Sequence, residues 1–386
     1  MDTQSLIQKQ IGLGNLNTPD PYDVWNMKTG QRVKKIYYKN KLLGSLPAAA
    51  LTIYDFFLNN KLRWGYSPRQ YPIAHAYRVL ISLTLYQKTG NEEYIISARE
   101  SLEWLGENYS RNYSGYCWCI NMPWVSKIAT YDEKTPHVTH TPYALEAFIR
   151  FQQETKTTKY DPIIDSVLNF LDKDLIKLVD SKDTLAVSYS PKTESRIVVN
   201  ANSYAMFCYA LLYGRNQNLN NHIGDSVMRL YHFLASTQHE DGSWHYFADD
   251  ADGNFIDCFH SCIVLKNIYK VNQIIPLPDS HQVIEKGYAY LKKYFWNDTK
   301  KLFKRFSITD RMSLVKFDLY DNAEMLNLAI ILKDDGLAGI LNDSIGRNFV
   351  AGTDIYSHII FPNLKINRNT LRWATYPYLY ALSKTI

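Results

Sequence analysis

The chain has 386 residues, 46% of them hydrophobic, so it is long enough to form one large core or two smaller ones. Its net charge of +5 comes from 43 basic and 38 acidic residues, which are spread along the chain rather than gathered in a basic tract. This spread, and the lack of recognition motifs, exclude nucleic acid as an expected partner.

The chain has five cysteines, an odd number, and they do not form the two C-x-x-C pairs that would indicate a zinc site. This favours a reducing compartment. The first twenty residues contain no basic segment followed by an apolar run. No stretch of 18 consecutive apolar residues occurs either. We therefore expect a cytoplasmic protein with at most peripheral membrane contact.

Apolar residues recur at helical spacing in about twelve segments, and these segments predict helices. They lie near 46–60 and at 72–88, 92–108, 142–155, 162–178, 201–214, 222–237, 256–272, 281–295, 322–333, 336–346 and 371–383. Strand signals are short, mainly near Ile197 to Val199 and Leu302 to Phe306. Because no Pro-, Gly- or Ser-rich linker divides the chain, we predict one all-α domain over 1–386, with 1–45 as an irregular N-terminal extension.

The predicted helices alternate in character. Those that begin near Pro72, Pro142, Ala201, Ile256, Asn322 and Leu371 are apolar nearly all round, whereas 92–108, 162–178, 222–237 and 281–295 carry charged stripes. A helix that is apolar on every side is buried and an amphipathic one lies outside, so the pattern predicts an (α/α)6 toroid of six helical hairpins. The long loops 110–139, 179–199, 239–254 and 296–319 all precede inner helices, so they should gather on one rim, where a ligand would meet helix N-termini.

The stretch QHEDGSWHY, which begins at Gln238, combines a helix end, a glycine turn and an indole. Gln238, Asp241, Gly242 and Trp244 in this arrangement can lock one hairpin to the next. We favour this structural role for Trp244, because a buried indole usually needs only one hydrogen-bond partner.

Asp257 and His260 are three residues apart at the start of an inner helix, so they share one face of it. Asp257 could orient His260 as a general acid or base. Alternatively, Asp257 only favours the positive helix end and His260 is a hydrogen-bonded core residue.

Asp321 and Glu324 look catalytic at first, but Asp-x-x-Glu before an apolar run is a capping-box pattern with Asp321 as the N-cap, and we favour that interpretation. Thr141 and Pro142 similarly fit an N-cap and a first helical residue, which places His137 and His140 in the loop above the rim. These two histidines lack a third ligand at a diagnostic spacing, so no metal site is predicted. Motifs for nucleotide cofactors are absent from the sequence, and no cofactor is expected.

Several stretches together resemble the VpsJ-like polysaccharide biosynthesis proteins: WGY at 64–66, PHVTHTPYALEA, SYSP with NAN at 200–202, QHEDGSWHY, FIDCFH, YDNAE and RWATYPYLYAL. The resemblance covers about residues 64–384 and is strongest over 188–269. It implies kinship with six-hairpin sugar enzymes such as N-acylglucosamine 2-epimerases, glucuronyl C5-epimerases and many glycosidases, and a role among surface glycans. Where similar proteins read F-H-T-G, this chain has Phe259, His260, Ser261 and Cys262.

Our leading hypothesis is an enzyme of capsule or lipopolysaccharide assembly that acts on a uronic-acid-containing saccharide as a C5-epimerase or related lyase. His260, His140 and Tyr189 are the candidates for proton transfer, and Arg372 for a carboxylate clamp. The alternatives are a glycoside hydrolase that uses Asp257 and Glu324, and a non-catalytic glycan-binding or scaffolding protein. The partner in each case is an oligosaccharide, a polysaccharide or a lipid-linked glycan. The candidate binding residues are Trp118, Trp124, His137, Asn200, Asn202, Trp244, Tyr246, Tyr320, Arg372 and Trp373.

Overall fold

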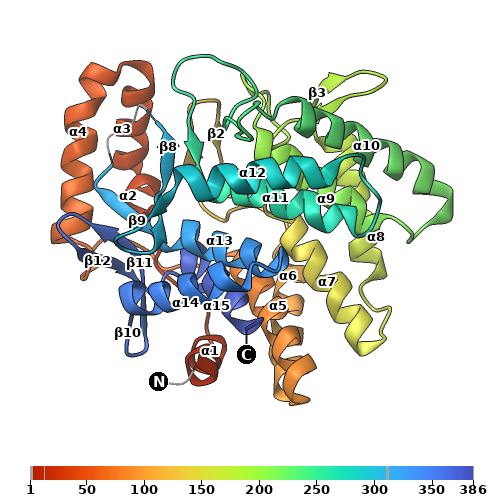
Figure 1. Ribbon diagram of the computed structural model, residues 1–386, viewed down its shortest axis with the longest axis horizontal. Coiled ribbons are helices and arrows are strands. Elements are labelled where there is room, and N and C mark those ends of the chain that lie inside the picture. Colours follow the sequence, from red (N-terminus) through yellow and green to blue (C-terminus); the bar gives the residue numbers. More distant parts are fainter. Residues whose placement is uncertain (1–2, 13, 310–312, 386) are drawn as a thin grey trace.

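The computed structural model describes residues 3–12, 14–309 and 313–385. Within these residues six helices pack side by side in a closed ring (Figure 1). In ring order they are α5 (Pro72–Thr89), α7 (Thr141–Thr155), α9 (Val199–Leu212), α11 (Cys258–Asn272), α13 (Leu319–Ile331) and α15 (Tyr376–Ser383), and α15 contacts α5. These are the helices predicted to be apolar all round, and their side chains form the core. The predicted all-α (α/α)6 toroid is confirmed.

The amphipathic helices cover the ring from outside, as predicted. They are α6 (Glu93–Glu107), α8 (Asp161–Asn169), α10 (Asn220–Ser236), α12 (Ser280–Tyr294) and α14 (Asp335–Phe349), each against one or two inner helices. The sixth outer position belongs to α1 (Thr3–Ile11), which contacts α15. Short π-helical or 3-10 turns extend or join the helices: η1 (Tyr54–Leu58), η2 (Phe170–Asp174), η3 (Gln217–Leu219) and η4 (Leu371–Thr375).

The N-terminal region differs from the prediction. Residues 1–45 were expected to be irregular, but their described part is mostly helical: α1, α2 (Asp23–Asn26), α3 (Lys28–Lys39) and the start of α4 (Lys41–Ile53). The segment near 46–60 is helical as predicted, yet it packs against α3 rather than serving as an outer helix of the ring. The expectation failed because the first forty residues lack the long apolar periodicity by which the ring helices were found.

Short antiparallel strands occupy the connections. Four pairs stand alone: β1 (Trp124–Val125) with β2 (Thr130–Tyr131), β3 (Lys177–Asp180) with β4 (Leu185–Val187), β5 (Ile256–Asp257) with β8 (Phe306–Ile308), and β6 (Trp296–Asn297) with β7 (Leu302–Phe303). A further sheet joins β9 (Val315–Asp318), β10 (Val350–Ala351), β11 (Asp354–Ile360) and β12 (Leu364–Arg368), with β11 bonded to the other three. The β11–β12 hairpin was not predicted. It precedes α15, so every inner helix from α7 onward is entered through a long connection.

Two tryptophans fasten these connections to outer helices. Trp118 Nε1 donates to the Leu105 carbonyl at the end of α6 at 3.0 Å, and Trp244 Nε1 donates to the Leu234 carbonyl near the end of α10 at 2.9 Å. A glycine precedes each indole. A Cβ on Gly115 would lie 2.0 Å from the Ser166 carbonyl oxygen, and one on Gly242 would lie 2.3 Å from the Lys286 carbonyl oxygen. Gln238 Nε2 adds a bond of 3.0 Å to the Val283 carbonyl on α12, so this stretch locks one hairpin to the next, as predicted.

Gly242→Ala should therefore destabilise the protein more than Gly214→Ala. Both glycines have positive φ, +93° and +84°, but no atom lies within 4 Å of a Cβ at Gly214. The control thus carries only the left-handed backbone cost of about 1–2 kcal/mol. Gly242→Ala must also displace α12, at a further cost of about 1–3 kcal/mol. Urea unfolding of both variants measures the difference, and equal losses would show that the close approach to α12 does not matter.

Candidate active site

A cavity of about 500 Å³ opens on the rim where the inner helices begin. Its wall is built from the connections that lead into α7, α9, α11, α13 and α15, together with residues of α2 and α3. Polar side chains at helix starts and aromatic side chains from the loops thus meet in one pocket. Such a mixture, apolar surface with a few convergent polar groups, is typical of small-molecule sites.

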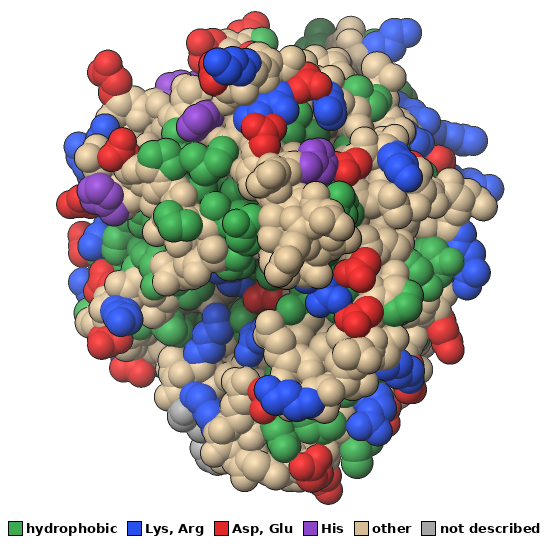
Figure 2. All heavy atoms as spheres, turned by 90° about the vertical axis from the view of Figure 1, so that its right-hand side faces the viewer, with side chains coloured by type: hydrophobic (Ala, Val, Ile, Leu, Met, Phe, Trp, Pro, Cys, Tyr) green, Lys and Arg blue, Asp and Glu red, His purple; other side chains and the backbone are tan. Residues whose placement is uncertain are grey.

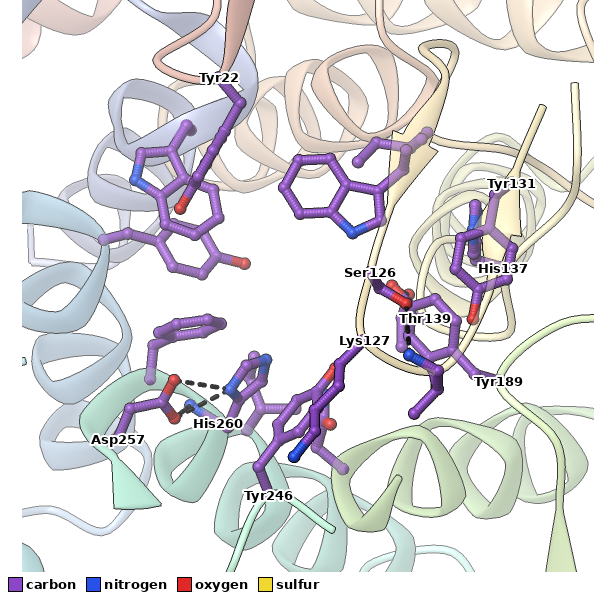
Figure 3. A pocket seen from close by; sticks show the side chains of 18 of the residues that line it. Tyr22, Ser126, Lys127, Tyr131, His137, Thr139, Tyr189, Tyr246, Asp257 and His260 are labelled. Atoms are coloured by element: carbon purple, nitrogen blue, oxygen red, sulfur yellow. Dashed lines mark hydrogen bonds and ion pairs between the residues drawn. The ribbon is translucent and has the colours of Figure 1, made fainter. Parts of the chain in front are cut away.

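Asp257 and His260 form a close pair on one side of this pocket (Figure 3). Both Asp257 carboxylate oxygens lie 2.8 Å from His260 Nδ1, and Oδ1 also accepts the His260 backbone N–H at 3.3 Å, so Asp257 is the N-cap of α11. Asp257 is 3% exposed and His260 is 21% exposed. The carboxylate therefore fixes the ring through Nδ1 and leaves the Nε2 edge for the pocket, the arrangement that orients a histidine for proton transfer.

The opposite side of the pocket carries Thr139, Tyr189 and His137 (Figure 3), together with His140. Thr139 Oγ1 lies 3.3 Å from the Tyr189 hydroxyl and 3.2 Å from His140 Nδ1. Burial lowers the pKa of His140 well below its usual value, and the nearby His137 and Arg372 lower it further. Burial also raises the pKa of Tyr189. At neutral pH this wall therefore presents an uncharged imidazole and a protonated phenol.

Aromatic rings form much of the remaining wall. Tyr320 and Trp373 stack with their centroids 4.5 Å apart, and Tyr22 meets Trp373 and Trp124 edge-on at 5.0 and 5.3 Å. Tyr246 lies against His260 at 4.7 Å. Such rings suit the apolar faces of sugars, and their polar edges suit the hydroxyls.

Three buried polar atoms of the pocket lining have no hydrogen-bond partner among the described residues. They are Asn200 Oδ1, His137 Nδ1 and Arg305 Nε. Burial lowers the pKa of His137 to about 3, with Lys192 adding to the effect, so this ring is neutral. Because an unsatisfied buried polar atom costs about 1–3 kcal/mol, all three atoms are candidates for contacts with a bound ligand.

Arg372 lines the pocket but is already engaged. Its Nε and Nη2 donate to the two carboxylate oxygens of Asp20 at 2.6 and 2.8 Å, and both residues are buried. A second guanidinium of the lining, that of Arg305, bonds Asp318 at 3.0 Å. The expected carboxylate clamp is thus partly neutralised by a residue of the N-terminal region.

Three predicted binding residues lie outside this cavity. Trp118 and Trp244 are buried and use their indole N–H groups for the locks described above. Asn202 is fully buried in α9, where Oδ1 accepts from Val187 N at 2.7 Å and Nδ2 donates to the Val198 carbonyl at 3.0 Å. Trp118 and Asn202 were expected among the binding residues, but neither lines the pocket: Trp118 bonds the end of α6, and Asn202 bonds backbone groups of the connection into α9.

Glu324 also lies outside the pocket lining. It is 1% exposed and its carboxylate lies 2.5 Å from Lys266 Nζ, deep between α11 and α13. This ion pair joins two inner helices and leaves no face for a sugar. The pairing of Asp257 with Glu324 as two hydrolytic carboxylates is therefore wrong.

The predicted cap at Asp321 is wrong as well. α13 begins three residues earlier than predicted, at Leu319, and Asp318 is its N-cap, accepting from Tyr320 N at 2.9 Å. Asp321 instead accepts from Phe259 N at 3.0 Å, so it holds the first turn of α11 beside His260. Likewise the N-cap of α7 is His140, and Thr141 is the first residue of the helix.

The structure adds residues that were not selected from the sequence. Thr139 lies between the two candidate histidines His137 and His140, in a stretch already noted in the sequence. Its hydroxyl could have identified it as a further polar residue of the site. Tyr22 comes from the region expected to be irregular, and Arg305 belongs to no motif. Among the described residues no group of three or more His, Cys, Asp or Glu side chains could hold a metal ion.

The fold is similar to those of several solved sugar enzymes. A sugar epimerase from a ruminal bacterium aligns with a TM-score of 0.62 and 13% identity over 83% of this chain and 89% of its own. Cellobiose 2-epimerase from Bacillus thermoamylovorans aligns with a TM-score of 0.64 and 10% identity, over 92% of this chain and 100% of its own. An inactive variant of the GH76A α-1,6-mannanase of Salegentibacter sp. was solved in complex with α-1,6-mannotriose. It aligns with a TM-score of 0.59 and 12% identity, over 99% of this chain and 97% of its own. At these identities the likeness is one of fold. No protein-family model and no curated protein matches the chain.

Asp321→Asn should preserve stability at neutral pH, whereas Asp321→Ala should lower it. Burial, and next the charge of Asp318, raise the pKa of the Asp321 carboxyl well above its usual value. An unfolded Asp ionises near pH 3.9, so the native state holds a proton that the unfolded state releases, and stability is lost as pH rises above about 4. Asn keeps an acceptor for Phe259 N without this loss, while Ala leaves that N–H unpaired at a cost of about 1–3 kcal/mol.

Thermal melts of wild type and Asp321→Asn between pH 4 and 8 measure this effect. The melting temperature of the wild type should fall relative to that of the variant as pH rises. Parallel curves would mean that Asp321 is ionised in the native state.

Proposed function

We propose that this protein is a carbohydrate epimerase, or a mechanistically adjacent lyase, that removes a proton from the sugar carbon next to a carboxylate or carbonyl. The observation that carries the proposal is the Asp257–His260 pair, which faces Thr139 and Tyr189 across an aromatic pocket (Figure 3). The sugar epimerases and isomerase among proteins of similar fold support the same class of substrate.

The chemistry follows from the two walls. With the proton of the neutral imidazole on Nδ1, facing Asp257, His260 Nε2 is free to accept a proton from the sugar. The electron pair of the broken C–H bond moves into an enolate, whose oxygens take the negative charge. Return of a proton to the other face, from the Tyr189 hydroxyl, gives the epimer. Loss of a leaving group from the neighbouring carbon gives the lyase product instead.

A uronic acid is the substrate we favour. Four basic side chains line the pocket, Lys34, Lys127, Arg305 and Arg372, whereas Asp257 is the one carboxylate among the described lining residues. The two guanidiniums are bonded to Asp20 and Asp318, but the lining itself still holds more basic than acidic side chains, which suits an acidic sugar and the enolate formed from it. Together with the resemblance to polysaccharide biosynthesis proteins, this excess of basic side chains supports a role in assembling a capsule or lipopolysaccharide on the cytoplasmic side, with a free or lipid-linked glycan as substrate.

The second candidate is epimerisation or isomerisation at C2 of a reducing-end sugar. The bidentate bond from Asp20 to Arg372 favours it, because part of the expected carboxylate clamp is already used. Two-carboxylate hydrolysis has less support, since the described lining holds a single carboxylate and that one is bonded to His260.

His260→Gln should abolish proton exchange while leaving the fold intact. Glutamine keeps a hydrogen-bonding side chain but cannot titrate near neutral pH, so turnover should fall by roughly 100-fold or more. The assay incubates uronate-containing oligosaccharides and reducing disaccharides in D₂O and locates incorporated deuterium by NMR. His281→Gln, on exposed α12, is the matched control and should behave as wild type.

Deuterium at C5 of a uronate would support the favoured substrate, and deuterium at C2 of a reducing sugar the second candidate. Normal incorporation by folded His260→Gln would remove this residue from the mechanism. Wild-type binding of these glycans without any exchange would instead favour a binding or scaffolding protein.

A further inference from the structure

The hairpin of α3 and α4 stands at the edge of the molecule, away from most of the ring (Figure 1). Only Asn40 separates the two helices, and α4 continues into η1. The helices approach closely, since a Cβ on Gly44 would lie 2.2 Å from the Tyr37 Cα. The hairpin is therefore a defined structural unit with one outer surface.

The outer face of α4 is apolar where a water-facing helix would be polar. Leu42 is 87% exposed and Leu46 is 80% exposed, and Ile53 and Phe57 continue the same helical stripe. Gly44 and Asp55, on the opposite side of the helix, are the buried positions. Leu62 and Trp64, both 78% exposed, extend this surface beyond the helix. The 18 residues Lys41–Leu58 are long and apolar enough to cross a membrane by length and composition alone, and only 11% of them are buried.

α3 carries a basic stripe. Lys28, Arg32, Lys35 and Lys39 are all exposed and lie at i, i+4, i+7 and i+11, on one face of the helix. No Asp or Glu occurs between Asp23 and Asp55. By contrast, charges of both signs are mixed over the side of the molecule that Figure 2 shows, which faces away from the hairpin.

We propose that the α3–α4 hairpin docks this protein onto an anionic lipid surface, with the apolar face of α4 among the acyl chains and the α3 stripe at the headgroups. Exposed apolar area and adjacent Lys/Arg are the two signals that hold a helix in a membrane interface. A second copy of the chain fits less well, because a two-fold interface through this hairpin would bring the two basic stripes together.

The hairpin lies on the bilayer rather than spanning it. α3 packs along α4, so a spanning α4 would draw the basic stripe of α3 into hydrocarbon. The end of the hairpin that follows α4 is also tied to the rest of the protein. Asp55 accepts a 2.7 Å bond from the Tyr66 hydroxyl, and Asn60 Nδ2 donates to Asn367 at 2.8 Å.

Docking would bring the pocket close to the membrane. α3 contributes Lys34 and Tyr38 to the pocket lining, so the helix that holds the basic stripe also borders the site. A glycan attached to a membrane lipid is the substrate that benefits from this placement, an extension that rests on the proposed function. Docking itself is measured without any sugar, so its failure and that of the proposed function are distinguishable.

Co-sedimentation with vesicles of phosphatidylcholine, with and without phosphatidylglycerol, tests the proposal. Wild type should bind the anionic vesicles and lose binding as salt rises. Lys35→Gln/Lys39→Gln should weaken vesicle binding by about 30-fold, the factor expected when the electrostatic attraction of two basic residues to an anionic surface is lost. Leu42→Gln/Leu46→Gln/Ile53→Gln should weaken it by at least about 10-fold.

The controls change other exposed residues, away from the hairpin. Ile96→Gln/Ile340→Gln and Lys182→Gln/Lys286→Gln should bind vesicles as wild type does, and all variants should melt as wild type because the changed side chains are exposed. Absence of binding to anionic vesicles at low salt would overturn the proposal. So would equal losses in the control variants, or a dimer in analytical ultracentrifugation that the α4 variant dissociates while vesicle binding stays unchanged.

Discussion

The closure of the inner ring is the constraint on which the rest of this molecule depends. Six helices that are apolar on nearly every side can be shielded from water only by one another and by an outer layer, and the contact of α15 with α5 completes that arrangement. Once the ring is closed, the inner helices point their N-termini to one rim. The pocket, its helix caps and its aromatic wall all follow from this single orientation.

The backbone N–H and C=O groups of long connections over such a rim need hydrogen-bond partners within the protein. Buried side chains supply these partners repeatedly. Asn202 in α9 and Asn322 in α13 occupy the fourth position of their helices and bond their connections alike: Oδ1 accepts from Val187 N or Phe303 N, and Nδ2 donates to the carbonyl before the helix. Trp118 and Trp244 form another repeated pair. A polar residue near the rim therefore bonds the backbone as readily as it serves chemistry, and its hydrogen-bond partners separate the two roles: Asn202 is satisfied by the backbone, whereas Asn200 Oδ1 has no described partner.

The same rule distinguishes the ionisable groups. Lys266 and Glu324 neutralise each other between two inner helices, and loss of either partner would leave an unpaired buried charge. Asp257 also has a partner, but that partner, His260, keeps an edge in the pocket. What marks the candidate active site is thus an ionisable pair with one member facing open space. The α3–α4 hairpin presents the opposite case, because its apolar residues face outward. Only a lipid surface or a partner protein could cover them.

The sequence by itself determined the fold, because a 3.6-residue apolar period and the alternation of all-apolar with amphipathic helices leave few arrangements other than a double ring of helices. It also placed Asp257, His260, Tyr189 and His140 at loops that share a rim. It could not decide which polar side chains are already bonded inside the fold, since Asn202, Glu324 and Asp321 lie in stretches as suggestive as that of His260. Nor could it show that the apolar face of α4 stays exposed, or that Asp20 pairs with Arg372 across 352 positions. Those outcomes depend on which atoms meet in three dimensions, and only the tertiary structure decides them.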